Sequence, residues 1–433
     1  MPTIPLQARL GRRPPLPLAI AVARSWQGTL ARWAALAALM GFAVPAKADE
    51  ASQSPASVSA SYTAEDLTVA EGGIRRGSAF RGLAEACLQV DLSRLGAGAG
   101  SKLSMSVLDP SGDDVSADYA GDLQGASNIT TYNHILLYEL SLSGSFADGR
   151  VKVKAGRLLA DCDFAVTDSS SALLNSSFGW PTFISANTLN TGPAFDRSAL
   201  GLYAQIEFSR GYALRVGVYD GDTFDSTSGD PSRHPDGLNF KLSRSQGAFA
   251  IAELDVTRPS APGSDPTGVL KIGVWAHSAS FRDQCTTGKC HRGNGGVYAA
   301  GELPLWSKAV PGGPAVQSLT AFGRAGASPS DRDRVSLAVE AGLCAKGLVR
   351  GRGDDLLSLG AGFAGISSYA REAAKLSGAA ALASHELAVE ANYEASIGGH
   401  LMVVPDVQWI RHPGAVSGRR DVLLYGLRTQ VSF

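Results

Sequence analysis

The chain has 433 residues, of which 50 are glycine and 18% are charged, and its formal net charge is -1. This size allows one large barrel or two to three ordinary domains, and the high glycine content with modest charge argues against a disordered chain. Nucleic-acid binding is not indicated, because it would show as a basic excess or a basic stripe.

Residues 1–48 are predicted to be a signal peptide. Arg24 and Arg32 precede the apolar run 33–44, and Ala46-Lys47-Ala48 provides a small-x-small cleavage site. These features are typical of secretion through the Sec pathway. The alternative is a membrane anchor, but the apolar run is too short to span a bilayer comfortably. No later stretch is long enough for a transmembrane helix, so we expect a protein that is periplasmic, secreted, or inserted in the outer membrane as a barrel.

Residues 49–82 are rich in serine and alanine, and they predict a periplasmic lead-in with little regular structure. From Leu83 onward, alternating segments recur with turn residues between them, as expected for antiparallel strands. We expect about sixteen strands, or up to about eighteen, which is a porin-like number. The expected strands are 83–94, 102–109, 132–143, 150–156, 200–208, 212–219, 237–243, 248–256, 269–278, 297–306, 316–324, 335–343, 355–364, 386–394, 400–410 and 422–433.

The connections between these strands reveal one inconsistency. Short turns and long loops should alternate between the two ends of a barrel, and 365–384, 396–399 and 411–421 do so. The short turn 209–211 falls at the wrong end. We therefore expect that one strand has been missed or miscounted in the first half, for example within 110–131 or 220–246.

The two faces of the expected strands differ in chemistry. Leu270, Ile272 and Val274, for example, alternate with Lys271 and other polar or aromatic residues, because successive side chains of a strand point to opposite faces. A soluble sandwich would bury its apolar face, whereas here the other face carries Glu, Lys, Arg and Tyr in strand after strand, as a wet lumen requires. We predict an all-β fold, a transmembrane antiparallel barrel.

The last strand has a bulky residue at every second position and ends in an aromatic residue, Phe433. This is typical of the closing strand of an outer-membrane barrel, through which the barrel-assembly machinery would act. We expect 83–433 to form the barrel and the last strand to pair with a strand near Leu83, because a spanning sheet cannot leave an open edge in lipid. Arg428 and Gln430 would then face the lumen.

Five cysteines, at positions 87, 162, 285, 290 and 344, leave at least one thiol unpaired. Cys285 and Cys290 flank a polar segment, which predicts a small loop disulfide in an oxidising compartment. His291 beside them makes a metal site the alternative. We favour the disulfide, because structural zinc sites take four nitrogen or sulfur ligands and no fourth ligand is near.

Several segments together resemble the OprB-type carbohydrate-selective porins, over about residues 72–433. The most specific are Asn175-Ser176-Ser177-Phe178-Gly179-Trp180-Pro181 and Val404-Pro405-Asp406-Val407-Gln408-Trp409-Ile410. Weaker similarities lie in 146–164, 218–222, 347–355, 386–393 and 412–414. Arg157 stands where the family often has Gln, and Cys162 interrupts one motif. The resemblance implies passive diffusion of sugars through a constricted lumen.

The longest loop-like stretch, 160–198, is the expected constriction, because a long loop folded inward narrows a wide barrel. Asn175, Phe178 and Trp180 supply an amide and two rings for a sugar, although the rings can equally pack the loop onto the wall. Arg157, where a wall strand enters this loop, is the favoured charge of the constriction.

A second group of candidates lies on the polar faces of the expected strands. Most of these residues are equally compatible with an ordinary solvated wall, because lumens are polar anyway. The candidates for contact with the solute are Glu139, Lys154, Arg215, Trp275 and Glu340; Lys152, Glu207 and Glu390 lie on the same faces.

These observations predict a porin of the Gram-negative outer membrane, with its N-terminus in the periplasm, that lets small hydrophilic solutes diffuse, most plausibly mono- or oligosaccharides. The expected partners are sugars, outer-membrane lipid and the assembly machinery, in a monomer or homotrimer, without nucleic acid or cofactor. A general or anion-preferring porin, using Lys152, Lys154, Arg157 and Arg215, remains the alternative. An adhesin or a hydrolase is less favoured, since the sequence has no G-x-S-x-G, H-E-x-x-H or phosphate-loop motif.

Overall fold

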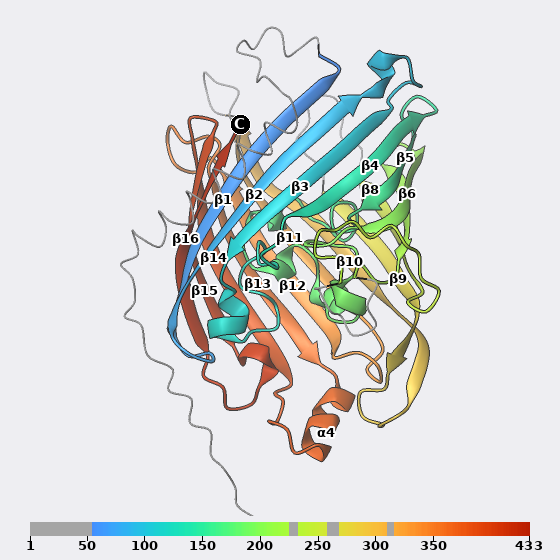
Figure 1. Cartoon of the computed structure of the whole chain (residues 1–433). Helices are drawn as coiled ribbons and strands as arrows, with labels where there is room; N and C mark the ends of the chain where they lie inside the picture. Colours follow the sequence, from blue (N-terminus) through green and yellow to red (C-terminus); the bar gives the residue numbers. More distant parts are fainter. Residues whose placement is uncertain (1–53, 225–232, 258–267, 310–315) are drawn as a thin grey trace, which may run out of the picture. The chain divides into compact units, whose positions relative to one another are not determined.

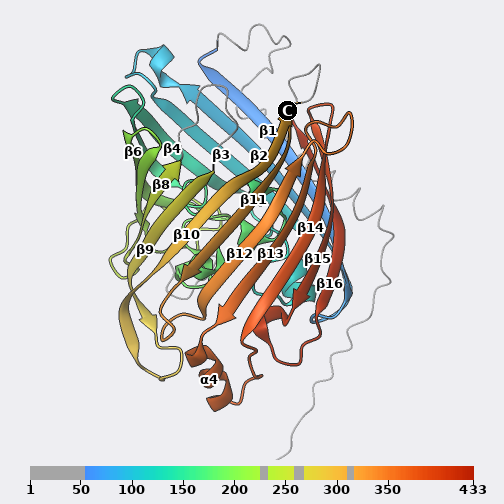
Figure 2. The same ribbon diagram turned by 180° about the vertical axis from the view of Figure 1, so that it is seen from behind.

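The structure is a computed structural model that describes residues 54–224, 233–257, 268–309 and 316–433. The predicted signal peptide, 1–48, lies outside the described residues. Within them sixteen antiparallel strands form one closed barrel (Figures 1 and 2). In chain order the strands are β1 Ala56–Glu71, β2 Gly77–Asp91, β3 Lys102–Gly112, β4 Leu136–Phe146, β5 Val151–Leu158, β6 Ala199–Ser209, β7 Tyr212–Asp220, β8 Ala248–Thr257, β9 Val269–Arg282, β10 Cys290–Ala309, β11 Val316–Ala327, β12 Val335–Lys346, β13 Leu356–Ile366, β14 His385–Ile397, β15 Leu401–Arg411 and β16 Val422–Ser432.

The barrel closes between its first and last strands. β1 pairs with β16 in an antiparallel register that includes Ser61 opposite Ser432 and Glu65 opposite Arg428, with one irregularity between Val69 and Glu71. Every other strand pairs with its neighbours in sequence. The barrel therefore has no free sheet edge, as a structure surrounded by lipid requires.

The prediction that 49–82 is an irregular lead-in is wrong, because all of β1 and the start of β2 lie within it. The barrel begins at Ala56 rather than at Leu83, and β1 rather than the strand containing Leu83 pairs with β16. The physical reason is composition: β1 has the sequence ASVSASYTAEDLTVAE, in which both faces carry small or polar residues. Such a strand shows little apolar alternation.

A second correction concerns 237–243, which was expected to be a strand and has no regular structure. The missed β1 and this surplus strand cancel in the total of sixteen. When 237–243 is not counted as a strand, the 209–211 turn falls at the same end of the barrel as the other short turns. This resolves the inconsistency in the connections. The miscounted strand thus lies in one of the two expected regions, 220–246.

The two ends of the barrel differ in the length of their connections. Both ends of the barrel sequence, Ala56 and Phe433, lie at the end that has the short turns after β4, β6 and β14. The opposite end carries the long connections 113–135, 159–198 and 367–384. The last of these contains helix α4, Ser368–Leu376, at the bottom of Figure 1.

The predicted alternation of faces is confirmed in the strands that carry large aliphatic residues. Leu270, Ile272 and Val274 on β9 are 48–51% exposed on the outer wall, whereas Trp275 and His277 are 3% and 2% exposed and point inward. In the described part of the chain, no helix is both long and apolar enough to cross a membrane.

Candidate functional site

The connection 159–198 folds into the barrel, as predicted. It contains four short helical turns, η3 Ser169–Ala172, η4 Ser176–Phe178, α3 Thr182–Ser185 and η5 Leu189–Thr191. Most of its residues are buried. We call 159–198 the constriction loop from here on.

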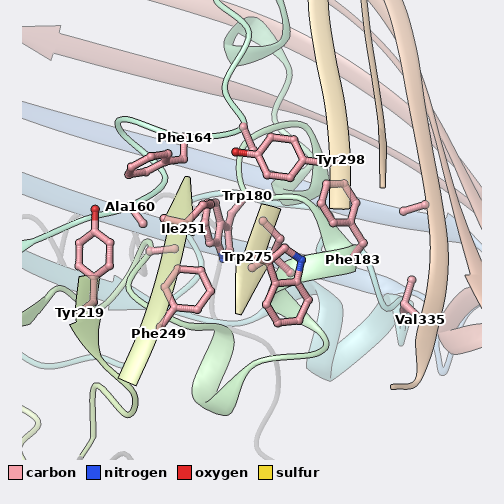
Figure 3. Packing of buried hydrophobic residues seen from close by; sticks show 14 of the residues in the cluster. Ala160, Phe164, Trp180, Phe183, Tyr219, Phe249, Ile251, Trp275, Tyr298 and Val335 are labelled. Atoms are coloured by element: carbon pink, nitrogen blue, oxygen red, sulfur yellow. The ribbon is translucent and has the colours of Figure 1, made fainter. Parts of the chain in front are cut away.

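Aromatic side chains pack the constriction loop against the wall formed by β7–β10 (Figure 3). The ring of Trp180 lies 6.4 Å from that of Phe249, and Phe249 lies 6.2 Å from Trp275. Phe183 lies 5.8 Å from Tyr298. Trp275, a predicted solute contact, is 3% exposed and belongs to this packing. Aromatic residues here fasten the loop to the wall.

Buried glutamates of the wall bind the backbone of the constriction loop. Glu253 on β8 accepts a 2.7 Å hydrogen bond from the Ala165 amide. Glu390 on β14 accepts hydrogen bonds of 2.5 and 2.9 Å from the amides of Leu174 and Asn175. Both glutamates are 0% exposed. A buried amide without a partner is costly, so these carboxylates stabilise the inward position of the loop.

Arg324 on β11 supplies the complementary donors. Its guanidinium donates to the carbonyls of Ala165, Ser177 and Gly179, the last at 2.8 Å. It is also paired with Glu340 on β12 through a 2.8 Å hydrogen bond from Nε. Arg324 and Glu340 are 4% and 3% exposed. Glu340 therefore positions the arginine and does not line a solvated surface.

Asn175 and Phe178, predicted solute contacts, also hold the loop. The Asn175 side chain is 0% exposed and caps η4, because its Oδ1 accepts from the Ser177 amide at 3.1 Å. Phe178 is 1% exposed and packs edge-on against Phe322, with ring centroids 6.2 Å apart. A side chain at Gly360 would lie 2.7 Å from the Phe178 ring, so this glycine makes room for it.

Arg157 is likewise 2% exposed. Its guanidinium donates to the hydroxyl and carbonyl of Ser198 and to the carbonyl of Asn239. It ties the end of the constriction loop to the segment that follows β7, and it does not line the cavity between this loop and the connection 113–135.

The remaining candidates stand closer to the lumen but are paired. Lys154 donates to Asp163 at 2.7 Å, and Arg215 forms a 2.6 Å ion pair with Asp255. Glu139 accepts a 2.6 Å hydrogen bond from the neighbouring hydroxyl of Ser141. Two of the four residues of the predicted basic stripe, Lys154 and Arg215, are thus paired with carboxylates.

An open polar cavity lies between the constriction loop and the connection 113–135. Its volume is about 750 Å³. Among the described residues its ionisable lining consists of one arginine, Arg81, and five aspartates, and its rings come from Tyr132, Trp180 and Phe195. The aspartates are Asp113, Asp114, Asp118, Asp161 and Asp196. Of the predicted site residues within the described ranges, Trp180 alone lines it.

The two loops around the cavity hold each other in place. The Asn128 amide donates to the Leu174 carbonyl, and the Ser176 amide donates to the Gly125 carbonyl, both at 2.7 Å. Arg81 is 4% exposed and donates to the Ile129 carbonyl and to Asn133 Oδ1, at 3.3 and 3.0 Å. The cavity is therefore preformed, because these contacts between its loops do not involve a solute.

Asp161 is the cavity carboxylate with the most altered protonation. Burial raises the pKa of its carboxyl to about 6, although the Phe195 amide donates to it at 2.8 Å and opposes the shift. The negative charge of the cavity therefore depends on pH in the mildly acidic range.

The sequence matches a family of known proteins. The model of the family described as "Carbohydrate-selective porin, OprB family" matches residues 78–433. The chain belongs to the OprB family. Among curated protein sequences none matches the chain closely enough to indicate a relationship.

Solved structures share the OprB fold of this chain. The high-pH structure of Pseudomonas putida OprB aligns with a TM-score of 0.77 at 18% identity, over 89% of this chain and 96% of that one. The low-pH structure of the same protein aligns with a TM-score of 0.55 at 14% identity, over 89% and 95%. The outer-membrane channel DcaP of Acinetobacter baumannii gives 0.52 at 11% identity, over 87% and 97%.

Cys285 and Cys290 of this OprB-family chain are not joined: both thiols are free in the structure. The carboxylate of Asp283 holds their hairpin, accepting from the amides of Cys285 and Thr286 at 3.0 and 2.7 Å and contacting His291 at 2.8 Å. These bonds lower the pKa of Asp283. In the described part of the chain no group of three or more His, Cys, Asp or Glu residues could hold a metal ion.

The aspartates that line the cavity of this OprB-family porin were missed because they lie outside the strands. Asp113, Asp114 and Asp118 follow β3 in a segment considered only for a missing strand. The available signal was the density of Asp and Asn between 113 and 133. Sequence alone does not show that this loop meets the constriction loop.

Proposed function

We propose that this OprB-family porin of the outer membrane passes neutral sugars through the cavity between its two inner loops. The observation that carries the proposal is that this cavity combines exposed hydrogen-bonding groups with rings. Tyr132 is 49% exposed at its lining. A sugar presents hydroxyls all round and apolar C–H faces, so it requires both kinds of partner.

Selection in a channel also requires weak binding, since a solute that binds tightly does not leave. The wall side chains of Glu253, Glu390 and Arg324 already form hydrogen bonds with the constriction loop. The solute would therefore meet mainly the polar groups of the cavity.

The charge of the cavity argues against the anion-preferring alternative. Its ionisable lining among the described residues is one arginine and five aspartates. The basic residues Lys154 and Arg215 are engaged by Asp163 and Asp255. Coulomb repulsion by the aspartates would disfavour an anionic solute in this cavity.

The arrangement of the connections supports an orientation. Outer-membrane barrels have short periplasmic turns and longer extracellular loops. The cavity and α4 would then lie on the extracellular side, and Ala56 and Phe433 on the periplasmic side. A solute entering from outside would meet the acidic cavity first, and Phe433 would be placed for the assembly machinery.

The proposal is tested by titrating glucose against the ion current of single channels in planar bilayers. Tyr132→Ala should weaken the block of the current by glucose, because a ring is removed from the cavity. Tyr369→Ala is the matched control, since Tyr369 is 43% exposed on α4, outside the cavity lining. Equal block in both variants and the unaltered protein would refute the cavity as the sugar path.

A further inference from the structure

A groove lies on the outer wall of the barrel, where β5 and β6 run side by side (Figure 1). Its volume is about 800 Å³. Ala155, Gly156 and Gly201 line it together with Leu202 and Val218, which are 65% and 47% exposed. A second hollow, of about 610 Å³, shares Ala155, Leu202 and Val218 and continues the depression toward the turn after β4. We call the 800 Å³ groove the wall groove.

The segment that follows β7 covers one end of the wall groove. Arg157 donates to the carbonyl of Asn239 and fastens this segment to the wall. Leu238, Phe240 and Leu242 are 55%, 50% and 70% exposed, and Leu242 lines the groove. Three large apolar side chains exposed at alternate positions indicate contact with an apolar phase and not with water.

The wall groove reaches one edge of the apolar belt. Phe208 and Tyr212, whose ring centroids are 6.1 Å apart, are 60% and 43% exposed beside the 209–211 turn. Exposed aromatic residues at this position are typical of the girdle that marks the other edge of the belt. Leu200 stands at the opposite end of β6, an 11-residue strand, and lines the groove. A tilted strand crosses the belt in roughly ten residues, so this end of the groove lies where lipid headgroups begin.

Arg244 places a positive charge at that level. It lines the wall groove and is exposed, and within the described ranges its guanidinium forms no hydrogen bond or ion pair. Asp220, the carboxylate of the lining, is 7% exposed, so the charge that a ligand can reach is positive. The Ser278 hydroxyl, also in the lining, accepts from the Ala248 amide at 2.8 Å and keeps its own proton for donation.

We propose that the wall groove and Arg244 form a binding site for one phosphorylated lipid of the outer leaflet. An acyl chain would lie between Leu202, Val218 and Leu242, and the phosphate would accept from Arg244 and Ser278. A guanidinium suits this role because it presents paired N–H donors to phosphate oxygens. The choice of leaflet rests on the orientation proposed above, whereas binding itself rests on the groove alone.

A phosphorylated lipid uses both halves of the site, which other occupants do not. An uncharged lipid would leave the guanidinium of Arg244 without a partner. Free phosphate would leave the apolar side chains of the groove unused, although burial of apolar surface is a main driving force of association. A basic residue beside apolar residues at the membrane surface is the arrangement that attracts anionic headgroups.

The test is native mass spectrometry of the purified, folded barrel in detergent. The probe is lipid A carrying two phosphates, compared with the same lipid after removal of its phosphates. We expect one lipid A per barrel and a lower affinity for the dephosphorylated lipid. Arg244→Gln should lower the affinity for lipid A by about tenfold or more, because a hydrogen bond to a charged group corresponds to at least that factor. Arg411→Gln, at an exposed arginine of β15, is the matched control.

The apolar half of the site is tested by filling it. Ala155→Trp places a large ring in the wall groove, and Ala341→Trp, at an exposed alanine of β12, is the matched control. We expect Ala155→Trp to weaken the binding of both lipids and Ala341→Trp to leave it unchanged. Heat-modifiable migration on gels establishes that each variant is folded.

Four outcomes overturn the proposal. They are equal affinities for the two lipids, unchanged binding in Arg244→Gln, equal effects of the two tryptophans, and displacement of lipid A by inorganic phosphate, which would make the anion alone the ligand. None of these measurements involves the passage of sugar, so their failure would leave the proposed sugar path untouched.

Discussion

Arg324 is the wall residue whose loss should release the constriction loop most directly. It is buried, and its guanidinium is shared between Glu340 and the carbonyls of Ala165, Ser177 and Gly179. Arg324→Leu removes all of these donors. We expect the loop to leave its inward position and the lumen to widen.

The magnitude follows from the number of bonds lost. A hydrogen bond that involves a charged group contributes about 1.5–3 kcal/mol, so three loop carbonyls correspond to roughly 4–9 kcal/mol of attachment. This is comparable to the whole stability of many domains. The bonds to Glu253 and Glu390 remain, so we expect partial opening and not loss of the barrel.

The assay is single-channel conductance in planar bilayers, together with the block of the current by glucose. Arg324→Leu should raise the conductance and weaken the block. Arg411→Leu is the matched control, because Arg411 is exposed at the end of β15. Heat-modifiable migration on gels checks that each variant is folded.

A double variant separates release of the loop from damage to the wall. Arg324→Leu alone leaves the buried carboxylate of Glu340 without its partner, which is strongly destabilising. Arg324→Leu with Glu340→Leu removes that charge and still leaves the loop carbonyls without their donors. The double variant should conduct like the single variant. Unaltered conductance and glucose block in a folded double variant would refute the anchoring role.

Three further predictions concern the cavity and the loop. Asp113→Asn with Asp114→Asn should shift the reversal potential in a salt gradient away from cations; an unchanged potential would mean that these carboxylates do not face the ion path. The pKa of Asp161 is raised to about 6 from 3.8, so its neutral form stabilises the fold at low pH, and this stabilisation is lost as the pH rises through about 6. Cation preference should therefore increase between about pH 5 and pH 7, and Asp161→Asn should reduce this change; an identical pH profile would contradict it. Gly360→Val should displace Phe178 and raise conductance, whereas normal conductance would show that the loop tolerates the methyl groups.

The fold was largely predictable from the sequence, since in most strands lipid and lumen impose opposite preferences on alternate residues. Leu270, Ile272 and Val274 make this pattern plain in β9. β1 was missed because its outer face carries Tyr62, Asp66 and Thr68 where the other strands carry aliphatic residues. The strand least visible in the sequence is thus one whose outer face is unlike a lipid contact.

The site was less predictable, because an inward-facing polar residue can meet either a solute or a folded loop. Glu340 and Trp275 point into the barrel, but Glu340 pairs with Arg324 and Trp275 packs against Phe249. Asn175 belongs to the constriction loop and caps η4. Nothing in the spacing of Arg324 indicates that it binds three carbonyls more than 140 residues away. Such contacts depend on the path of the loop.

Sugar selectivity is tested most directly by swelling of liposomes that contain the purified porin. Glucose, sucrose and a neutral amino acid similar in size to glucose are compared at equal osmolarity. We expect glucose to enter clearly faster than the amino acid, because the cavity offers both rings and hydrogen-bonding groups. Equal rates for glucose and the amino acid would contradict selection of sugars by this lumen.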